Sequence, residues 1–334
     1  MSGIQNYFNL KNKILSLSPE IDFNETALEV FYYQYNFNSL YKDFCDFLHK
    51  SPTNISSIEQ IPFLPISFFK SQKILSSIIK PSHIFKSSGT TSAIRSSHYI
   101  TDIELYKASF LKGFQKFYHA PSDYIIFALL PSYIHQGESS LVFMVDDLIK
   151  KSNNDLGGFY LKDYAQLIIN LKQASSQGKN ILLLGVTYAL LDLAELMDKD
   201  KIQNLIVMET GGMKGRRKEI LREQLHKMLT SAFGVQKIHS EYGMTELLSQ
   251  AYSKGDGIFY SSDTMQLLIR DTNDPFSINP VGKSGGINII DLSNLNSCSF
   301  IATQDLGKTR ADGGFEILGR FDNSDIRGCN LLVQ

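Results

Sequence analysis

The residues with the clearest chemical potential form a short loop rich in hydroxyl groups. It begins with Ser87, Ser88, Gly89, Thr90, Thr91 and Ser92. The cations Lys86 and Arg95 stand at its two ends. Backbone N–H groups and hydroxyls on small side chains can surround an anion closely, and the cations supply positive charge. No Gly-Lys-Ser/Thr closes the loop as in a Walker P-loop, so it is either another kind of phosphate-binding loop or an ordinary Ser/Thr-rich turn.

Residues 87–95 resemble the phosphate-binding signature of adenylate-forming enzymes. Ser92, Ile94 and Arg95 stand where that superfamily usually has Gly, Pro and Lys. A second motif, at 242–246, matches the superfamily pattern Tyr-Gly-x-Thr-Glu and follows an expected strand. Alone, this second motif would be read as a solvated turn, but its position after the first favours a nucleotide site.

Two further segments continue the resemblance in the expected order. Residues 303–307 and 313–320 are similar to Thr-Gly-Asp-Leu-Gly and the Gly-Arg that follows it, with Gln304 in place of the Gly. Residues 209–214 correspond to a glycine-bearing loop that lines the adenine pocket. Four motifs in this order identify the chain as a member of the adenylate-forming superfamily.

The resemblance implies a role for each motif. Thr245 would contact the nucleotide phosphate, and Glu246 would help to hold Mg²⁺, which takes oxygen ligands. Asp305 would bind the ribose hydroxyls, because a carboxylate can accept two hydrogen bonds from a diol. Arg320 would lie near the ribose or the α-phosphate. The remaining residues expected at the nucleotide are Gly211, Gly212, Tyr242 and Gly243.

The end of the sequence distinguishes one branch of the superfamily. Full ligases continue past a hinge with a mobile domain and its lysine, whereas this sequence stops at Gln334 and is expected to lack them. Residues 61–70, the hydroxyl-rich loop and the Arg-Gly-Cys ending at Cys329 resemble the acyl-protein synthetase (LuxE) family, whose members move an acyl group onto their own cysteine. Cys329 is the corresponding nucleophile, with arginines nearby to lower its pKa. The alternative is a tail cysteine without a function.

Other chemically capable residues are ambiguous. His135 follows an expected strand and either lines the site at the carboxyl edge of the sheet or packs elsewhere; His239 has the same two interpretations. Cys45 and Cys298 are expected to pack as small apolar groups. A Gly-x-Ser-x-Gly nucleophile elbow is absent, and no histidine pair has metal-ligand spacing.

Apolar runs and helical patterns alternate between residues 82 and 244. Strands are expected at 82–85, 97–100, 124–130, 180–184, 204–208 and 237–240, with helices around 164–171 and 221–229. This alternation predicts an α/β layer with a mainly parallel sheet. After Gly255 only short strands are expected, at 257–260, 265–269, 286–290 and 315–318.

The expected fold is therefore the α/β domain of adenylate-forming enzymes with a β-rich C-terminal subdomain and without the mobile lid. The expected divisions are a helical segment at 1–60, an α/β core at 61–255, a β-rich subdomain at 256–318 and a hinge-like tail at 319–334. The aromatic residues between 31 and 47 either pack on the main domain or dock another protein. Pro62 and Pro65 predict an extended connector.

Composition excludes several classes of protein. The 33 Lys and Arg balance 34 Asp and Glu, so no basic field for nucleic acid is expected. Three scattered cysteines make neither a disulfide framework nor a zinc site. The sequence predicts no signal peptide and no membrane span, and the expected location is the cytoplasm.

The sequence thus predicts an enzyme that activates a carboxylic acid, with fatty acids suggested by the family, using ATP and Mg²⁺ and passing the acyl group to Cys329. An acyl carrier protein or an acyl-accepting reductase is the expected partner. Two alternatives stay open: direct transfer from the adenylate to a carrier thiol or small acceptor, and an inactive nucleotide-binding scaffold.

Overall fold

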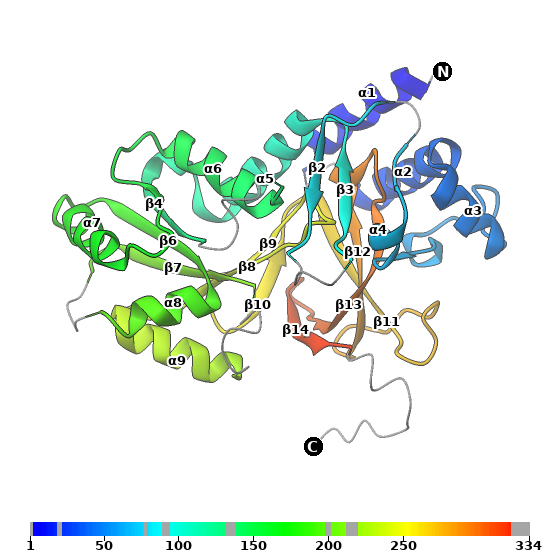
Figure 1. Ribbon diagram of the computed structural model, residues 1–334. Coiled ribbons are helices and arrows are strands. Elements are labelled where there is room, and N and C mark those ends of the chain that lie inside the picture. Colours follow the sequence, from blue (N-terminus) through cyan, green and yellow to red (C-terminus); the bar gives the residue numbers. More distant parts are fainter. Residues whose placement is uncertain are drawn as a thin grey trace.

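One sheet runs through the part of the chain that the computed structural model describes, which is residues 3–18, 22–76, 79–88, 94–130, 138–197, 202–211 and 220–321. Within these residues the sheet has twelve strands, in the order β11-β12-β13-β14-β10-β9-β8-β7-β6-β4-β5, with β1 paired to β13. Figure 1 shows it extending across the molecule, from the strands β4 and β6 to the strands β12 and β11.

One half of the sheet is parallel, as predicted. Its strands are β4 (Tyr124–Leu129), β5 (Gly158–Phe159), β6 (Asn180–Val186), β7 (Leu205–Thr210) and β8 (His239–Tyr242). Its helices are α5 (Ile103–Tyr118), α6 (Ser140–Ser152), α7 (Tyr164–Ser176), α8 (Thr187–Ala194) and α9 (Arg222–Phe233). Figure 1 shows α5 and α6 on one side of these strands and α8 and α9 on the other. Because both faces are covered, β4 and β6 are apolar along nearly their whole length. The strands and helices predicted here are confirmed, with β7 and β8 displaced by one or two residues.

The other half is antiparallel and continuous with the first through β8 and β9. Its strands are β9 (Ala251–Ser253), β10 (Ile258–Ser261), β11 (Met265–Arg270), β12 (Gly285–Asp291), β13 (Phe300–Thr309) and β14 (Phe315–Arg320). The short β1 (Leu64–Pro65) is added to β13 in parallel. The four strands predicted after Gly255 are confirmed, whereas β9 and the long β13 were not predicted. The parallel arrangement therefore describes half of the sheet.

The N-terminal helices pack on the antiparallel half. They are α1 (Gly3–Leu15), α2 (Phe23–Phe37) and α3 (Ser39–Phe47), followed by η1 (Ile58–Gln60) and α4 (Phe68–Ser71). Phe31, Tyr33 and Tyr41 are fully buried, and the Tyr41 and Phe300 rings stack 5.9 Å apart. The packing interpretation of the aromatic segment is confirmed for these residues, although Phe47 is 82% exposed.

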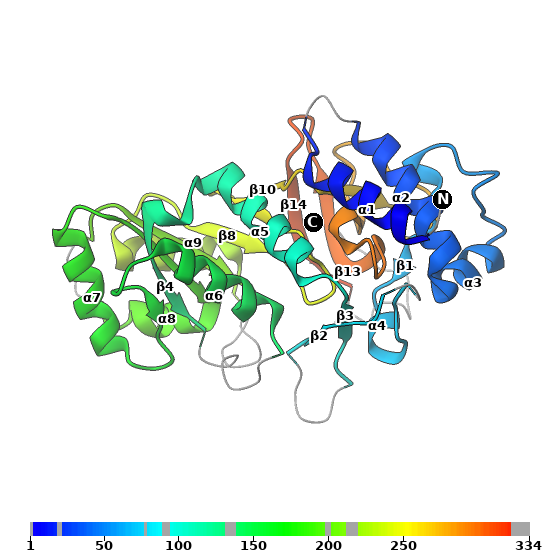
Figure 2. The ribbon, with the colours of Figure 1, turned by 90° about the horizontal axis from the view of Figure 1, so that it is seen from above.

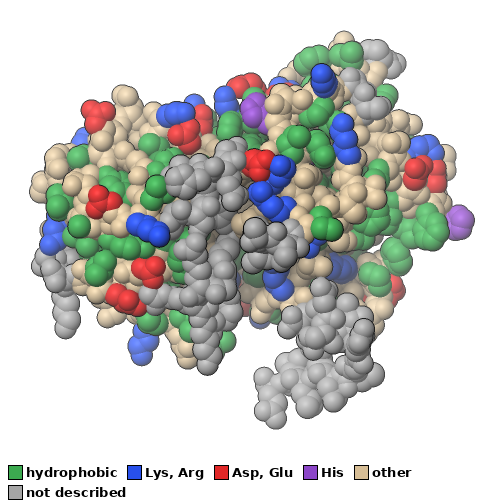
Figure 3. All heavy atoms as spheres, in the orientation of Figure 1, with side chains coloured by type: hydrophobic (Ala, Val, Ile, Leu, Met, Phe, Trp, Pro, Cys, Tyr) green, Lys and Arg blue, Asp and Glu red, His purple; other side chains and the backbone are tan. Residues whose placement is uncertain are grey.

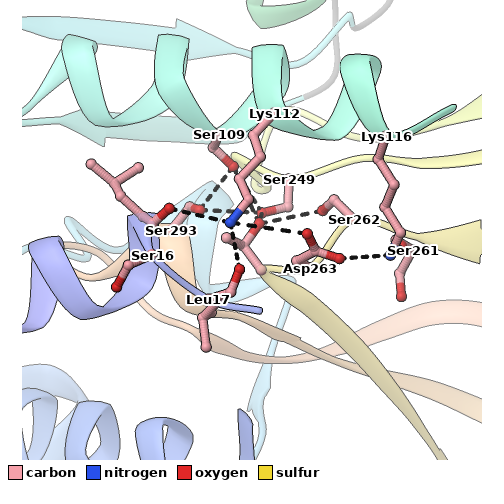
Figure 4. Close-up of polar contacts among 12 residues, drawn as sticks. Ser16, Leu17, Ser109, Lys112, Lys116, Ser249, Ser261, Ser262, Asp263 and Ser293 are labelled. Atoms are coloured by element: carbon pink, nitrogen blue, oxygen red, sulfur yellow. Dashed lines mark hydrogen bonds and ion pairs between the residues drawn. The ribbon is translucent and has the colours of Figure 1, made fainter. Parts of the chain in front are cut away.

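Two hydrophobic cores result, one around the parallel strands and one between the N-terminal helices and the antiparallel strands. Helix α5 lies where they meet: its Tyr106 belongs to the first core and its Leu105 to the second. Lys112 of α5 donates to the carbonyl of Leu17, 2.6 Å away, and Figures 2 and 4 show α5 reaching the N-terminal helices at this point. The division into the four segments expected from the sequence stays a prediction.

A separate hairpin carries the hydroxyl-rich loop. It consists of β2 (His83–Lys86) and β3 (Ser97–Ile100), as predicted, with Lys86 opposite Ser97 in antiparallel register. Figure 3 shows acidic and basic side chains interspersed on this face of the molecule. Among the described residues, no helix has the length and apolar character needed to cross a bilayer.

Candidate active site

The ends of the hydroxyl-rich loop are joined to each other. Ser87 N–H donates to the Ser96 carbonyl (3.1 Å), and Ser96 N–H donates to Ser87 Oγ (2.9 Å). Ser88 follows, exposed, at the point where the loop leaves β2. The loop therefore connects two antiparallel strands rather than a strand and a helix. Gly89, Thr90, Thr91 and Ser92 lie outside the described residues.

The two loop cations share one acidic partner, Glu138. The Lys86 ammonium pairs with Glu138 Oε1, and Arg95 Nη1 lies 3.1 Å from Glu138 Oε2. Lys86 N–H also donates to the Glu138 carbonyl (2.8 Å). The hydrogen bond from Lys86, with the charges of Lys86 and Arg95, lowers the pKa of Glu138. The two cations expected from the sequence to bind a phosphate are thus paired with a carboxylate of the protein itself.

Strands β7 and β8 end side by side, and each carries a buried glutamate near this edge. Thr210 is opposite Glu241 in parallel register, and its hydroxyl donates to Glu241 Oε2 at 2.5 Å. Both Glu209 and Glu241 are buried. Burial, with the charge of Glu209, raises the pKa of Glu241 to about 7. Gly211 follows β7 at this edge in a left-handed conformation, with φ 56°, whereas Gly212 lies outside the described residues.

Tyr242, Asp305 and Arg320 form one hydrogen-bonded group from three separate motifs. The Tyr242 hydroxyl donates to Asp305 Oδ2 (2.7 Å), and Arg320 Nε donates to Asp305 Oδ1 (3.0 Å). Strand register explains the second contact, since Asp305 of β13 is opposite Arg320 of β14. The Asp305 side chain is 9% exposed and that of Arg320 is 71% exposed. Gly243, next to Tyr242, leaves room for the Glu241 carboxylate, which a Cβ there would meet at 2.5 Å.

The Thr245–Glu246 pair lies in a turn after β8. Glu246 is buried, and burial raises its pKa, an effect opposed by a hydrogen bond with Ser96 and by the charges of Arg320 and Lys70. The Glu246 carboxylate is therefore close to the end of the hydroxyl-rich loop. Within the described residues, no group of three or more His, Cys, Asp or Glu side chains could hold a metal on its own.

The structure settles some ambiguous residues and leaves others. His239 is hydrogen-bonded to Tyr118, with 3.0 Å between its Nδ1 and the hydroxyl. It therefore packs at the beginning of β8, at the end of the strand opposite to Tyr242. Cys45 and Cys298 are fully buried, as expected. His135 and Cys329 lie outside the described residues.

Three side chains at the site were not predicted from sequence: Glu138, His98 and Asn294. His98 and Asn294 contact the peptide carbonyls of Thr245 and Glu246. One signal in the sequence could have pointed to His98. Ser96, His98 and Ile100 alternate as buried residues along β3, so His98 is a polar residue at an inward-facing position of a strand.

The fold and the arrangement of these motifs define an adenylate-forming ligase fold. The chain matches an open conformation of 2-hydroxyisobutyryl-CoA ligase in complex with 2-HIB-AMP and CoA, with TM-score 0.67 and 14% identity, over 92% of this chain and 77% of that chain. It also matches ATP-bound MatB from Rhodopseudomonas palustris, with TM-score 0.53 and 18% identity, over 72% of this chain. The match spans 48% of the MatB chain, about half its length.

Within that fold class, the sequence gives the family. The model of the acyl-protein synthetase family, LuxE, matches residues 155–334, which is more than half of the chain. The chain therefore belongs to the acyl-protein synthetase (LuxE) family, as predicted. A curated relative, the long-chain-fatty-acid–luciferin-component ligase of Aliivibrio fischeri, is 23% identical over 338 residues, covering 91% of this chain and 86% of the relative.

Proposed function

We propose that this protein activates a carboxylic acid with ATP, forming an acyl-adenylate, and then moves the acyl group to Cys329. The name of the Aliivibrio relative makes long-chain fatty acids the first class of acid to test. The observation that carries the proposal is that Asp305 gathers Tyr242 and Arg320 from motifs far apart in the chain. Family membership supports the same activity.

In the first half-reaction, a carboxylate oxygen of the acid bonds to the α-phosphorus of ATP, and the bond from that phosphorus to the pyrophosphate oxygen breaks. Asp305 accepts hydrogen bonds from the ribose hydroxyls and so fixes the nucleotide. Lys86 and Arg95, with donors of the loop, balance the charge that develops on the departing pyrophosphate. Catalysis at this step is mainly positioning and charge stabilisation.

The residues present fit a magnesium ion that is held jointly with the nucleotide. Glu246 offers a buried carboxylate and Thr245 a neighbouring hydroxyl, and Mg²⁺ commonly uses one or two protein oxygens together with substrate phosphates. These two residues would hold it, and the bound ion would neutralise phosphate charge. Burial alone disfavours the ionised Glu246, so a nearby cation would offset that penalty.

In the second half-reaction, the Cys329 thiolate attacks the acyl carbonyl, a thioester forms and AMP leaves with the electrons of the broken anhydride bond. The other two cysteines are poor candidates for this acceptor. Burial raises the pKa of Cys45 to about 12, and it also raises that of Cys298, so neither readily forms a thiolate. Cys329 is thus the acceptor that the chemistry favours.

A carboxylate-dependent ATP–pyrophosphate exchange assay tests the first half-reaction, with fatty, aryl and short-chain acids. Labelled acid then tests the second, on wild type, Cys329→Ser and the control Cys45→Ala. We expect exchange in all three and stable, hydroxylamine-sensitive label on wild type and Cys45→Ala only. Exchange without protein label would favour direct transfer to an external thiol or small acceptor. ATP binding without exchange for any acid would favour the scaffold alternative.

A further inference from the structure

The Thr245–Glu246 turn is held by its peptide carbonyls. His98 Nδ1 lies 2.7 Å from the Thr245 carbonyl oxygen, and Asn294 Nδ2 donates to the Glu246 carbonyl at 2.7 Å. Residues 243–250 have no helix or strand of their own. Their backbone position is therefore set largely by contacts with side chains from elsewhere in the chain.

The two side chains come from different elements of the fold. His98 lies on β3, the strand that leaves the hydroxyl-rich loop, and is opposite Phe85 on β2. Asn294 ends the short helix η4 (Leu292–Asn294), which follows β12. Asp291, just before that helix, accepts from the N–H groups of Leu248 (2.7 Å) and Ser249 (3.0 Å). The turn is thus fixed between the loop hairpin and the end of β12.

Both side chains are almost completely inaccessible, and each has one acceptor atom without a hydrogen-bond partner among the described residues. His98 is 0% exposed and Asn294 is 1% exposed. Because Nδ1 donates to a carbonyl, the neutral His98 ring has a lone pair on Nε2. This Nε2 and Asn294 Oδ1 find no hydrogen-bond partner among the described residues. Both residues line a small cavity of about 10 Å³, which is about the space of one water. One water has the two O–H donors that two acceptors need.

We propose that His98 and Asn294 are positioning residues for the adenylation site, setting the distance between the β2–β3 hairpin and Thr245–Glu246. This inference rests on the proposed function. Their buried amide and imidazole groups act only through the peptide carbonyls of the turn. His98 of β3 links the β2–β3 hairpin to Thr245, and Asn294 of η4 links the end of β12 to Glu246.

The test compares three substitutions at His98 in ATP–pyrophosphate exchange, with kcat and the half-saturating Mg²⁺ concentration as readouts. His98→Asn places an amide donor near the position of Nδ1, whereas His98→Gln places it near Nε2 and His98→Leu has none. We expect His98→Leu and His98→Gln to lower kcat tenfold or more and to raise the Mg²⁺ requirement, and His98→Asn to stay within threefold of wild type. His239→Leu controls for loss of a mostly buried histidine and should leave the Mg²⁺ requirement unchanged.

A second pair of variants tests the contact between Asn294 and the turn. Asn294→Asp removes the donor to the Glu246 carbonyl and should lower kcat tenfold or more. Asn296→Asp is its control: Asn296 donates to the Thr101 hydroxyl, which can reverse its hydrogen bond, so kcat should stay within threefold. If His98→Leu, His98→Gln or Asn294→Asp folds and keeps the wild-type rate and Mg²⁺ requirement, the proposal is overturned.

One readout does not depend on activity. In wild-type protein labelled with ¹⁵N-histidine, the signal that disappears in His98→Asn should show a proton on Nδ1 and a bare Nε2. The opposite tautomer would overturn the contact with Thr245 even in a protein without exchange activity. Absence of exchange in wild type together with the Nδ1–H tautomer would overturn the proposed function and leave the contact established.

Discussion

Asp305 has both carboxylate oxygens engaged, one by Tyr242 and one by Arg320. Each oxygen still has a lone pair for a ribose hydroxyl. The partners differ in accessibility, because Tyr242 is buried whereas the Arg320 side chain is 71% exposed. At the scale of the residue, the buried tyrosine therefore fixes the orientation of the carboxylate.

Tyr242→Phe is expected to weaken ATP binding about tenfold, since a hydrogen bond to a charged group contributes about 1.5–3 kcal/mol. Isothermal titration calorimetry with ATP measures the change directly. Tyr260→Phe is a matched control, because the Tyr260 hydroxyl bonds to Asp312 in the same way (3.2 Å) but at the exposed end of the β13–β14 hairpin. Equal ATP affinity in wild type and Tyr242→Phe would contradict the assigned role of Asp305.

Glu138→Gln is expected to strengthen ATP binding several-fold, because the amide no longer neutralises Lys86 and Arg95. A partly exposed ion pair contributes up to about 1 kcal/mol, which corresponds to about fivefold in Kd. Glu104→Gln, which breaks the exposed pair with Lys107 on α5, should change nothing. The gain should shrink as salt is raised, and a weaker Kd would show instead that Glu138 orients the cations for ATP.

At the scale of elements, the strands that are continuous apolar runs gave the clearest signal in the sequence, whereas β5, β9 and β13 were not predicted. Residues 124–130 and 180–184 are recognisable because both faces of β4 and β6 are covered. Strand β13 alternates between more and less buried positions through its polar half. Its sequence there was therefore recognised as the nucleotide motif at 303–307 and not as a strand. His98 and Glu138 escaped prediction because their partners lie 147 and 43–52 residues away in sequence, and only the fold brings them together.

Gln34 docks helix α2 on the end of η4 and on the segment that follows it. Its amide donates to the carbonyls of Asn294 (2.9 Å) and Leu295 (3.0 Å), and its oxygen accepts from Ser299 N–H (3.0 Å). Gln34→Glu puts a carboxylate against two carbonyls in a buried position. We expect a loss of about 3 kcal/mol in the free energy of unfolding, measured by urea titration.

The control for this docking is Gln166→Glu on α7, where the amide is exposed and bonds only to Asn170 among the contacts found for it. It should change stability by less than about 0.5 kcal/mol. A loss of similar size in both variants would show that the α2 contact is not what holds this helix. A lower rate of ATP–pyrophosphate exchange in Gln34→Glu would also be consistent with Gln34 helping to hold Asn294 in place.

At the scale of the whole molecule, the site lies where the two hydrophobic cores meet. Tyr242 belongs to the core of the antiparallel half, and Leu248, six residues later, belongs to the other. The buried ionisable groups of this region respond to pH in opposite directions. Burial lowers the pKa of His98 to about 4, so its contribution to stability is lost as pH falls from about 6.5 towards 4. Glu241, whose pKa is raised, contributes stability that is lost as pH rises.

The substitution Glu241→Gln tests how the ionisation of Glu241 changes stability with pH. The folded wild type binds more protons than the unfolded chain between pH 4.5 and about 7, so its stability falls across this window relative to the variant. The variant should gain on the order of 3 kcal/mol over wild type by pH 8, and little at pH 4. Urea titrations at several pH values give the difference, with Glu25→Gln on α2 as the exposed control. A difference independent of pH would contradict the buried, protonated state of Glu241.

The pairing of Glu138 with Lys86 and Arg95 also bears on which anions the loop accepts. An anion that enters must exchange with a carboxylate that is part of the same chain and therefore present at a high effective concentration. Inorganic phosphate must make this exchange with few new contacts in return. A nucleoside triphosphate meets the same competitor with several charges and with a ribose that we propose Asp305 binds. If the loop binds the triphosphate as proposed, this tethered carboxylate would favour a polyanion over singly or doubly charged small anions.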